Sequence, residues 1–210
     1  VQPSFGAPSI EGHHDDVWAA AGVAEQVRFG EALGADAHVI ACFGDPGLHA
    51  ARELARGPVI GIAEAAFHAA TLVATGFSVV TTLARTCVIA EHLVLQYGFE
   101  RRCRGIHATD IAVLELEDPA SRAFDRILAC AQEALAHDRS GAIVLGCAGM
   151  ADLCHALQQR LGVPVIDGVG AAVKLAEALV ALGLSTSKLG DYAAPLAKPY
   201  AGLAAAFSPR

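Results

Sequence analysis

An internal repeat is the sequence feature that most constrains the fold of this chain. Two apolar runs, Val39–Gly44 and Val144–Gly149, end alike in Cys, one further residue and Gly, and their cysteines lie 105 residues apart. Each copy continues through a helical pattern into Pro-Val-Ile, which begins at Pro58 in the first copy and at Pro164 in the second. A repeat of about half the chain predicts two similar lobes rather than a solenoid of many short units.

Short apolar runs alternate with longer helical patterns throughout the 210 residues. Strands are predicted at residues 38–41, 58–62, 77–82, 103–107, 142–146 and 163–167. Helices are predicted near residues 47–56, 64–75, 85–97, 119–136, 151–161 and 171–182. Because each predicted strand is a nearly continuous apolar run, we expect parallel sheets that helices cover on both faces.

The predicted fold class is α/β, with two pseudosymmetric lobes, each a parallel sheet covered by helices, and an active-site cleft between them. Residues 1–80 and 183–210 are assigned to one lobe and residues 81–182 to the other. An N-terminal strand of the first lobe is not visible in the sequence. The tail from Gly183 contains three prolines, so it is predicted to be a packed or swapped extension with broken helices.

The two repeated cysteines, Cys42 and Cys147, are the candidate catalytic residues. Each ends a predicted strand, and parallel α/β sheets bind ligands beyond the carboxyl ends of their strands. A helix that begins directly after each Cys would lower the thiol pKa and favour a thiolate near neutral pH. Two facing lobes would then hold one thiol on each side of a cleft. Inversion of a carbon atom needs this arrangement, with a base on one face and an acid on the other.

The alternative for any cysteine in an apolar run is a buried core position. The matched spacing argues against that alternative for Cys42 and Cys147. Four cysteines lack such a match and are expected to be core residues: Cys87, Cys103, Cys130 and Cys154. The chain has neither a CxxC nor an HxxxH pattern, so no metal site is expected.

Composition excludes several classes of protein. Hydrophobic residues make up 54% of the chain and the net charge is −7, which argues against both disorder and nucleic-acid binding. We see no apolar run long enough for a membrane span, no signal-peptide pattern and no Gly-rich dinucleotide motif. We therefore expect a cytoplasmic protein that acts on a small molecule, without cofactor, nucleic-acid or membrane partner.

Three segments resemble motifs of one protein family. Ala41–Leu48 and Leu145–Met150 resemble the two cysteine motifs of the hydantoin and allantoin racemases, in the aspartate/glutamate racemase superfamily. Pro3–Gly12 is similar to that family's Gly-Pro-x-Ser-Ile-Glu-Gly loop, with Ala7 inserted. The resemblance spans Val1 to about Gly183. Nothing in the sequence matches the strand ending in Asn-Pro-Asn-Thr with which family members usually begin.

The resemblance implies cofactor-independent racemisation at C5 of a 5-substituted hydantoin, a cyclic ureide, by a homo-oligomer. The residues beside the cysteines suit a flat, neutral ring, which backbone N–H groups can hold and which can lie near the ring of Phe43. No Arg lies close to either Cys in the sequence, so a carboxylate clamp is not evident. The candidate substrate-binding residues are Phe43, Gly44, Thr81, Thr82, Ala148 and Gly149. For the two threonines, ordinary β-branched strand positions are the alternative.

Two other functions stay open. One is an amino-acid racemase, or a related isomerase or decarboxylase, of the same superfamily. The other, of a different class, is a two-lobed small-molecule binding protein. Among the remaining polar residues, Asp45 and Asp167 are interpreted as turn or cap residues and Glu64 as a helix start. His13 and its neighbour His14 are interpreted as an exposed polar turn.

Overall fold

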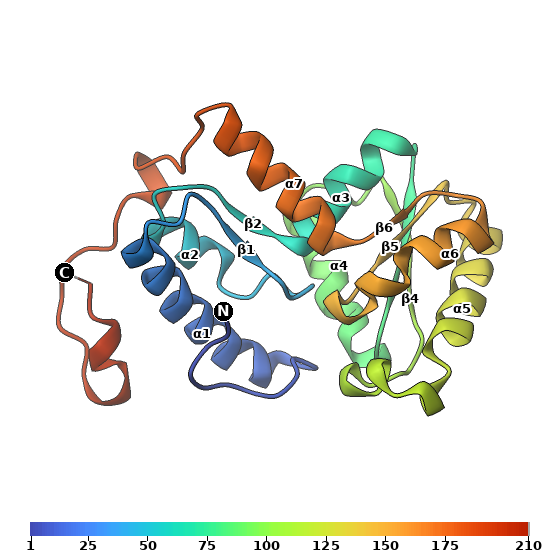
Figure 1. The fold of residues 1–210 in the computed structure, drawn as a ribbon, viewed down its shortest axis with the longest axis horizontal. Helices are drawn as coiled ribbons and strands as arrows, with labels where there is room; N and C mark the ends of the chain where they lie inside the picture. Colours follow the sequence, from blue (N-terminus) through green and yellow to red (C-terminus); the bar gives the residue numbers. More distant parts are fainter. Residues whose placement is uncertain (210) are drawn as a thin grey trace.

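A computed structural model describes residues 1–209, and it contains two parallel sheets with helices packed beside them (Figure 1). The smaller sheet has the order β1-β2, with β1 at His38–Ile40 and β2 at Val59–Gly61. The larger sheet has the order β4-β3-β5-β6, with β3 at Phe77–Thr81, β4 at Cys103–Ala108, β5 at Ala142–Leu145 and β6 at Val165–Ile166. The predicted α/β class with parallel sheets is confirmed.

The strand pairs follow the internal repeat. His38 of β1 pairs with Val59 of β2, and Ile143 of β5, 105 residues beyond His38, pairs with Val165 of β6. The next residue pair in each copy keeps the same correspondence. The repeat in the sequence is therefore also a repeat in strand register, and each cysteine follows the equivalent strand of its sheet.

Seven α-helices surround the sheets within residues 1–209. They are α1 at His13–Leu33, α2 at Leu48–Leu54, α3 at Ile62–Val73, α4 at Cys87–Gln96, α5 at Ala123–Asp138, α6 at Cys154–Leu161 and α7 at Gly168–Ala181. Short 3-10 helices lie at Ala84–Thr86, Val113–Glu117, Pro119–Ser121, Ala148–Leu153, Gly190–Tyr192 and Gly202–Phe207.

The sequence prediction missed α1, the longest helix. Only Gly22 and Val27 of its 21 residues are buried, so its apolar residues form no clear stripe. No side chain caps its first turn, and Gly34 ends it in the left-handed conformation that favours glycine. The interpretation of His13 and His14 as a polar turn was wrong, because both lie in the first turn of this helix.

Several helix boundaries also differ from the prediction. The helix predicted at residues 119–136 is interrupted at Arg122, whose φ of 52° is left-handed, and α5 begins at the next residue. Helix α7 begins three residues earlier than predicted, because the Asp167 carboxylate accepts the backbone N–H groups of Val169 and Gly170, at 2.9 and 2.7 Å. Asp167 therefore has the cap role that the sequence suggested.

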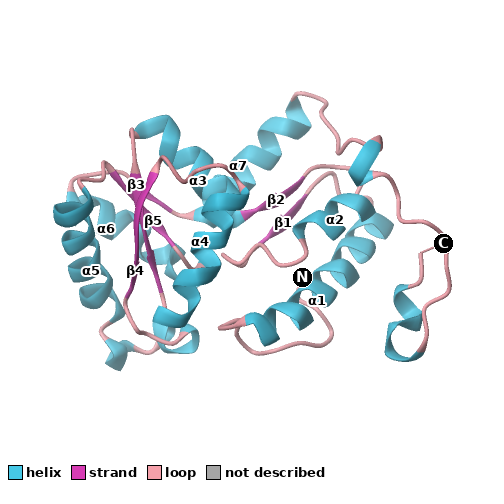
Figure 2. Ribbon diagram, turned by 180° about the vertical axis from the view of Figure 1, so that it is seen from behind, coloured by secondary structure: helices cyan, strands magenta, loops and turns pink. Residues whose placement is uncertain are grey.

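Helices α3 and α7 lie where the two sheets meet. Helix α3 follows β2 in the chain, yet it packs on β5 of the larger sheet, while α7 follows β6 and packs on β1 and β2. Figure 2 shows α5 and α6 on the face of the larger sheet that lies opposite α3. The lobe boundary predicted at residue 80 lies within β3, which pairs with β4 and β5 in the larger sheet. Because α3 and α7 each pack on the sheet that precedes the other helix, these two helices join the two sheets.

The tail after α7 packs on the first lobe of its own chain. The backbone N–H of Thr186 donates to the carbonyl of Arg56 at 3.0 Å, and Lys188 Nζ donates to the carbonyl of Arg52 at 2.6 Å, near the end of α2. Further along, Arg28 of α1 donates to the carbonyl of Phe207 at 2.6 Å. Of the two alternatives raised by the sequence, the structure has the packed one, with 3-10 turns in place of α-helix.

Among residues 1–209, no helix combines the length and the apolar character that crossing a membrane would require.

Candidate active site

Each cysteine opens a tight turn, and the two turns are alike. The carbonyl of Cys42 accepts the N–H of Asp45 at 3.0 Å, and the carbonyl of Cys147 accepts the N–H of Met150 at 3.1 Å. These partners are again 105 residues apart. After the turns the copies differ, because Ala148 begins a 3-10 helix directly whereas α2 begins only at residue 48. The local geometry at the sulfur atoms is thus repeated, while the helices beyond it are not.

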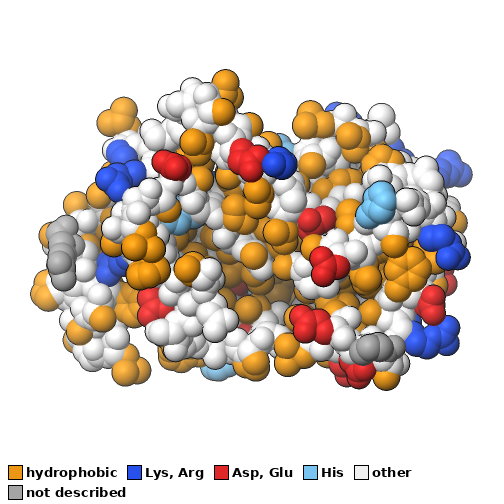
Figure 3. Space-filling view, viewed as in Figure 1, with side chains coloured by type: hydrophobic (Ala, Val, Ile, Leu, Met, Phe, Trp, Pro, Cys, Tyr) orange, Lys and Arg blue, Asp and Glu red, His pale blue; other side chains and the backbone are white. Residues whose placement is uncertain are grey.

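The two turns meet at one pocket of about 190 Å³. A pocket of this size suits a small ring better than a peptide. All eight residues singled out from the sequence line it: Cys42, Phe43, Gly44, Thr81, Thr82, Cys147, Ala148 and Gly149. Figure 3 shows the hollow between the lobes on one face of the molecule, bordered largely by hydrophobic side chains. The tertiary structure therefore brings together residues from both halves of the repeat.

Both thiols are poorly solvated in this pocket. Burial raises the pKa of Cys42 to about 12, with smaller contributions from the negative charges of Asp45 and Asp16, while a hydrogen bond from the N–H of Gly44 opposes the rise. Burial also raises the pKa of Cys147, against a hydrogen bond from the N–H of Gly149. The expected lowering of a thiol pKa was wrong, because desolvation outweighs the backbone dipoles and no helix begins at Cys42.

The threonines form one wall of the pocket. The Thr81 hydroxyl lies 3.1 Å from the carbonyl oxygen of Gly146 and donates to it, so towards a ligand this hydroxyl can only accept. The Thr82 side chain makes no hydrogen bond within the described residues and is free to donate. Thr86, which sequence reasoning overlooked, lines the pocket from the start of α4, and its hydroxyl donates to the Leu83 carbonyl at 2.7 Å.

Phe43 is more a core residue than an open aromatic face. Its side chain is only 7% exposed, and its ring packs edge-on against Phe67, with ring centroids 5.7 Å apart. It borders the pocket as part of the wall. A Cβ at Gly149 would lie 3.0 Å from Cδ1 of Leu116, which is tighter than usual, whereas a Cβ at Gly44 would meet only ordinary van der Waals contacts, at 3.7 Å or more.

Sequence reasoning missed the part of the pocket contributed by the N-terminal segment. Pro8, Ser9 and Ile10 line it from the loop before α1, and Asp16 lines it from the first turn of that helix. The Glu11 carboxylate fixes this loop, since it accepts the N–H of Val113 at 2.8 Å. A helix predicted at residues 13–33 would have placed Asp16 next to the Pro3–Gly12 loop, which is similar to the family's motif.

Asp45 follows Gly44, which lines the pocket, and its side chain has a structural role. Its carboxylate accepts the N–H groups of Ala63 and Glu64, both at 3.0 Å, and the hydroxyl of Tyr97 at 2.9 Å. It therefore caps the first turn of α3 from a different segment, and Glu64 lies at the helix start, as predicted. Burial raises the pKa of Asp45 to about 6, against these hydrogen bonds.

The four other cysteines are half-buried rather than fully buried core residues. Cys103, Cys130 and Cys154 pack against hydrophobic clusters, as expected, but Cys87 lies outside them, at the first residue of α4. All six thiols are free. Within the described part of the chain, no three His, Cys, Asp or Glu side chains are grouped closely enough to hold a metal ion.

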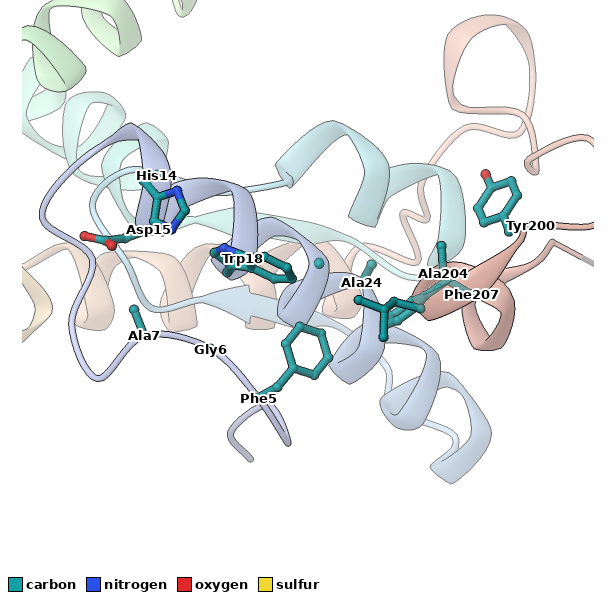
Figure 4. A pocket seen from close by; sticks show the side chains of 12 residues that line it. Phe5, Gly6, Ala7, His14, Asp15, Trp18, Ala24, Tyr200, Ala204 and Phe207 are labelled. Atoms are coloured by element: carbon teal, nitrogen blue, oxygen red, sulfur yellow. The ribbon is translucent and has the colours of Figure 1, made fainter.

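A larger pocket of about 860 Å³ lies away from the cysteines, between α1 and the tail (Figure 4). Apolar and aromatic side chains dominate its lining, among them Phe5, Trp18, Leu203 and Phe207. No thiol borders it. The chemistry-bearing residues are instead concentrated in the smaller pocket.

Comparison with known proteins finds a matching family and several similar proteins. Residues 1–176 match the family described as Asp/Glu/Hydantoin racemase. A hydantoin racemase of Rhizobium meliloti is 53% identical over 200 residues, which cover 95% of this chain and 83% of the relative. The solved allantoin racemase of Klebsiella pneumoniae is 59% identical with a TM-score of 0.96, over 99% of this chain and 85% of that one. The allantoin racemase structure of Pseudomonas fluorescens is 41% identical with a TM-score of 0.89, over 96% and 86%.

Proposed function

Because the chain belongs to the Asp/Glu/Hydantoin racemase family, we propose that it inverts C5 of a neutral 5-substituted hydantoin such as allantoin, with Cys42 and Cys147 as the two proton-transfer groups. The observation that carries this proposal is the pocket that both thiols line, each in an equivalent turn. The names of the similar proteins support a racemase, which is an isomerase, and they include both hydantoin and allantoin as substrates.

The proposed reaction begins at the C5–H bond beside the C4 carbonyl. One cysteine, as thiolate, takes this proton, and the electron pair left on carbon is delocalised onto the carbonyl oxygen as an enolate. The opposite cysteine, as thiol, returns a proton to the other face of C5. The first sulfur ends protonated and the second ionised, and proton exchange with solvent restores the starting state. No cofactor takes part in this proposal.

Backbone groups support both partial reactions. The N–H groups of Gly44 and Gly149 donate to the sulfur atoms and so favour the thiolates. The N–H groups of Phe43 and Ala148, one residue earlier in each turn, have no backbone partner within the described residues. We assign the N–H groups of Phe43 and Ala148 to the substrate carbonyls and the enolate oxygen, because the glycine N–H groups already donate to the sulfur atoms.

The lining of the pocket favours a neutral substrate over a free amino acid. None of the described residues that line it is Lys or Arg, so the carboxylate of an amino acid would find no cationic side chain there. This argues against the amino-acid racemase alternative, and family membership argues against a binding protein without activity. The six free thiols support the cytoplasm, a reducing compartment, as the proposed location.

Substitution of each cysteine tests the proposal. Cys42→Ala and Cys147→Ala should each lower the racemisation rate by roughly 10³-fold or more in a polarimetric assay on a hydantoin panel that includes allantoin, because each removes one of two proton-transfer groups. Cys154→Ala, outside the pocket, is the matched control and should keep its rate. In deuterated water, Cys42→Ser and Cys147→Ser should exchange C5–H of opposite enantiomers. Racemisation by either alanine variant near the wild-type rate would refute the two-cysteine mechanism.

A further inference from the structure

Asp16 is an unexplained carboxylate in the cysteine pocket. Apart from the two cysteines, it is the only ionisable side chain among the described residues that line this pocket. It lies in the first turn of α1, where its backbone N–H donates to the carbonyl of Gly12 at 3.1 Å. The proton transfers proposed above do not use it.

Asp16 and Cys42 both lie next to Gly44. The Oδ1 atom of Asp16 lies 3.7 Å, and the Sγ atom of Cys42 lies 3.8 Å, from the point that a Cβ of Gly44 would occupy. The carboxylate and the thiol therefore lie on either side of Gly44, and all three residues line the same pocket. A ligand in the pocket that packs against the Gly44 backbone would lie beside both groups.

The Asp16 carboxylate has no hydrogen-bond partner within the described residues. Its backbone N–H is satisfied, but neither of its carboxylate oxygens accepts a hydrogen bond there. Partial burial raises its pKa, and the charge of His13 only partly offsets this effect. Half-buried carboxylates that lack donors gain most from a ligand that brings N–H groups of its own.

We propose that Asp16 determines the substrate class of this pocket, by accepting a ring N–H of a neutral cyclic ureide and by repelling substrates that carry a carboxylate. This inference rests on the proposed function and deepens it. A hydantoin ring offers N–H donors and no negative charge, so it supplies what Asp16 lacks. An amino acid or a ring-opened N-carbamoyl amino acid would bring a second carboxylate next to the first, with no cationic side chain to balance them.

The role proposed for Asp16 concerns substrate binding and not proton transfer. Asp16→Asn keeps the size of the side chain and removes its charge. We expect KM for a hydantoin substrate to rise roughly 3- to 10-fold, because the amide oxygen still accepts the ring N–H but a neutral hydrogen bond is about half as strong as a charge-assisted one, while kcat changes less than about threefold. The same variant should bind an N-carbamoyl amino acid, used as a competitive inhibitor, about tenfold more tightly than the wild type does.

Asp15→Asn is the matched control. Asp15 precedes Asp16 in the same helical turn, but its carboxylate accepts the N–H of Glu11 at 3.0 Å and it borders the large apolar pocket (Figure 4). This variant should leave both KM and the inhibition constant within twofold of the wild type. A thermal melt of each variant confirms that it is folded. If Asp16→Asn does not fold, Asp16→Glu retains the charge and should still reject the carbamoyl amino acid as strongly as the wild type.

Three results would overturn the role of Asp16: an unchanged KM in Asp16→Asn, a loss confined to kcat, or acceptance of the carboxylate by Asp16→Glu. Calorimetric titration with unsubstituted hydantoin keeps the test separate from the proposed function. If the wild type racemises no hydantoin, the proposed function fails. Weaker binding of hydantoin by Asp16→Asn than by Asp15→Asn would then still support the contact with Asp16, and equal binding would refute it.

Discussion

At each cysteine, two successive backbone N–H groups have different partners. The N–H of Gly44 or Gly149 donates to the sulfur, whereas the N–H of Phe43 or Ala148 has no partner among the described residues. A single hydrogen bond does not offset the loss of hydration, so both thiol pKa values are raised. In the proposed mechanism, proton transfer at neutral pH would then depend on the small fraction of molecules in which one thiol is ionised.

Alkylation by iodoacetamide measures this fraction at Cys42. Because the thiolate is the reactive form and the pKa of Cys42 is raised to about 12, its rate should rise about tenfold per pH unit from pH 7 to 10. An unperturbed thiol, with a pKa of about 8.5, should level off above about pH 9 and serves as the control. The rate is followed by mass spectrometry of the Cys42 peptide. A rate that is flat between pH 7 and 9 would mean that the thiol is already ionised.

At the scale of elements, Asp45 joins the first cysteine turn to helix α3. It accepts two N–H groups of the first turn of α3 and the hydroxyl of Tyr97, in α4's C-terminal cap, so three segments depend on one carboxylate. Its φ of 44° is left-handed, and a Cβ at Gly61 would collide with its carboxyl group. The glycine at position 61 is therefore required by close approach. These contacts fix where the Cys42 turn lies relative to the larger sheet.

Asp45→Ala should lower the free energy of unfolding by about 2 kcal/mol, because it removes a helix cap and leaves Tyr97 without its acceptor. For a chain of this length that corresponds to a fall in Tm of roughly 4–8 °C by calorimetry. Asp167→Ala, which removes only the cap of α7, should cost about 1 kcal/mol. An equal effect of the two substitutions would contradict the role assigned to Asp45.

The stability of the wild type should also depend on pH more strongly than that of Asp45→Ala. The pKa of Asp45 in the folded chain is raised to about 6, so the stability that this group contributes is present at low pH and declines as the pH rises through 6. The wild-type free energy of unfolding should therefore fall between pH 5 and 7 more steeply than that of Asp45→Ala. Denaturant titrations at both pH values measure the difference.

At the scale of the whole molecule, the tail carries apolar side chains that its own chain leaves uncovered. Leu189, Leu196 and Leu203 are 86%, 82% and 93% exposed. Leu203 also lines the large apolar pocket between α1 and the tail. We propose that the exposed leucines of one copy contact the apolar pocket of a second copy, as the expected homo-oligomer would require.

Sedimentation equilibrium tests this association. We expect the wild type to have a mass above the 21.6 kDa of one chain, and Leu203→Asp to shift the equilibrium towards the monomer, because a charge would be buried in the contact. Leu72→Asp is the control, since Leu72 is 83% exposed at the end of α3, away from the tail. A monomeric wild type, or equal masses for both variants, would remove the tail from any interface.

The sequence by itself determined the features that depend on local pattern. Continuous apolar runs predicted parallel strands, and the repeated Cys-x-Gly turns predicted that Cys42 and Cys147 follow equivalent strands. These inferences hold because apolar periodicity and the residues of a tight turn can be read among neighbours in the chain. The resemblance to the racemases came from the same short segments.

Only the tertiary structure decided what depends on distant segments. The raised pKa of Cys42 reflects the loss of water when both lobes close around it, and Asp16 reaches the pocket from a helix with no apolar stripe in its sequence. The packing of α3 and α7 on each other's sheets also arises between residues far apart in the chain. Burial and long-range contact are properties of the assembled surface, so a pattern of neighbouring residues does not contain them.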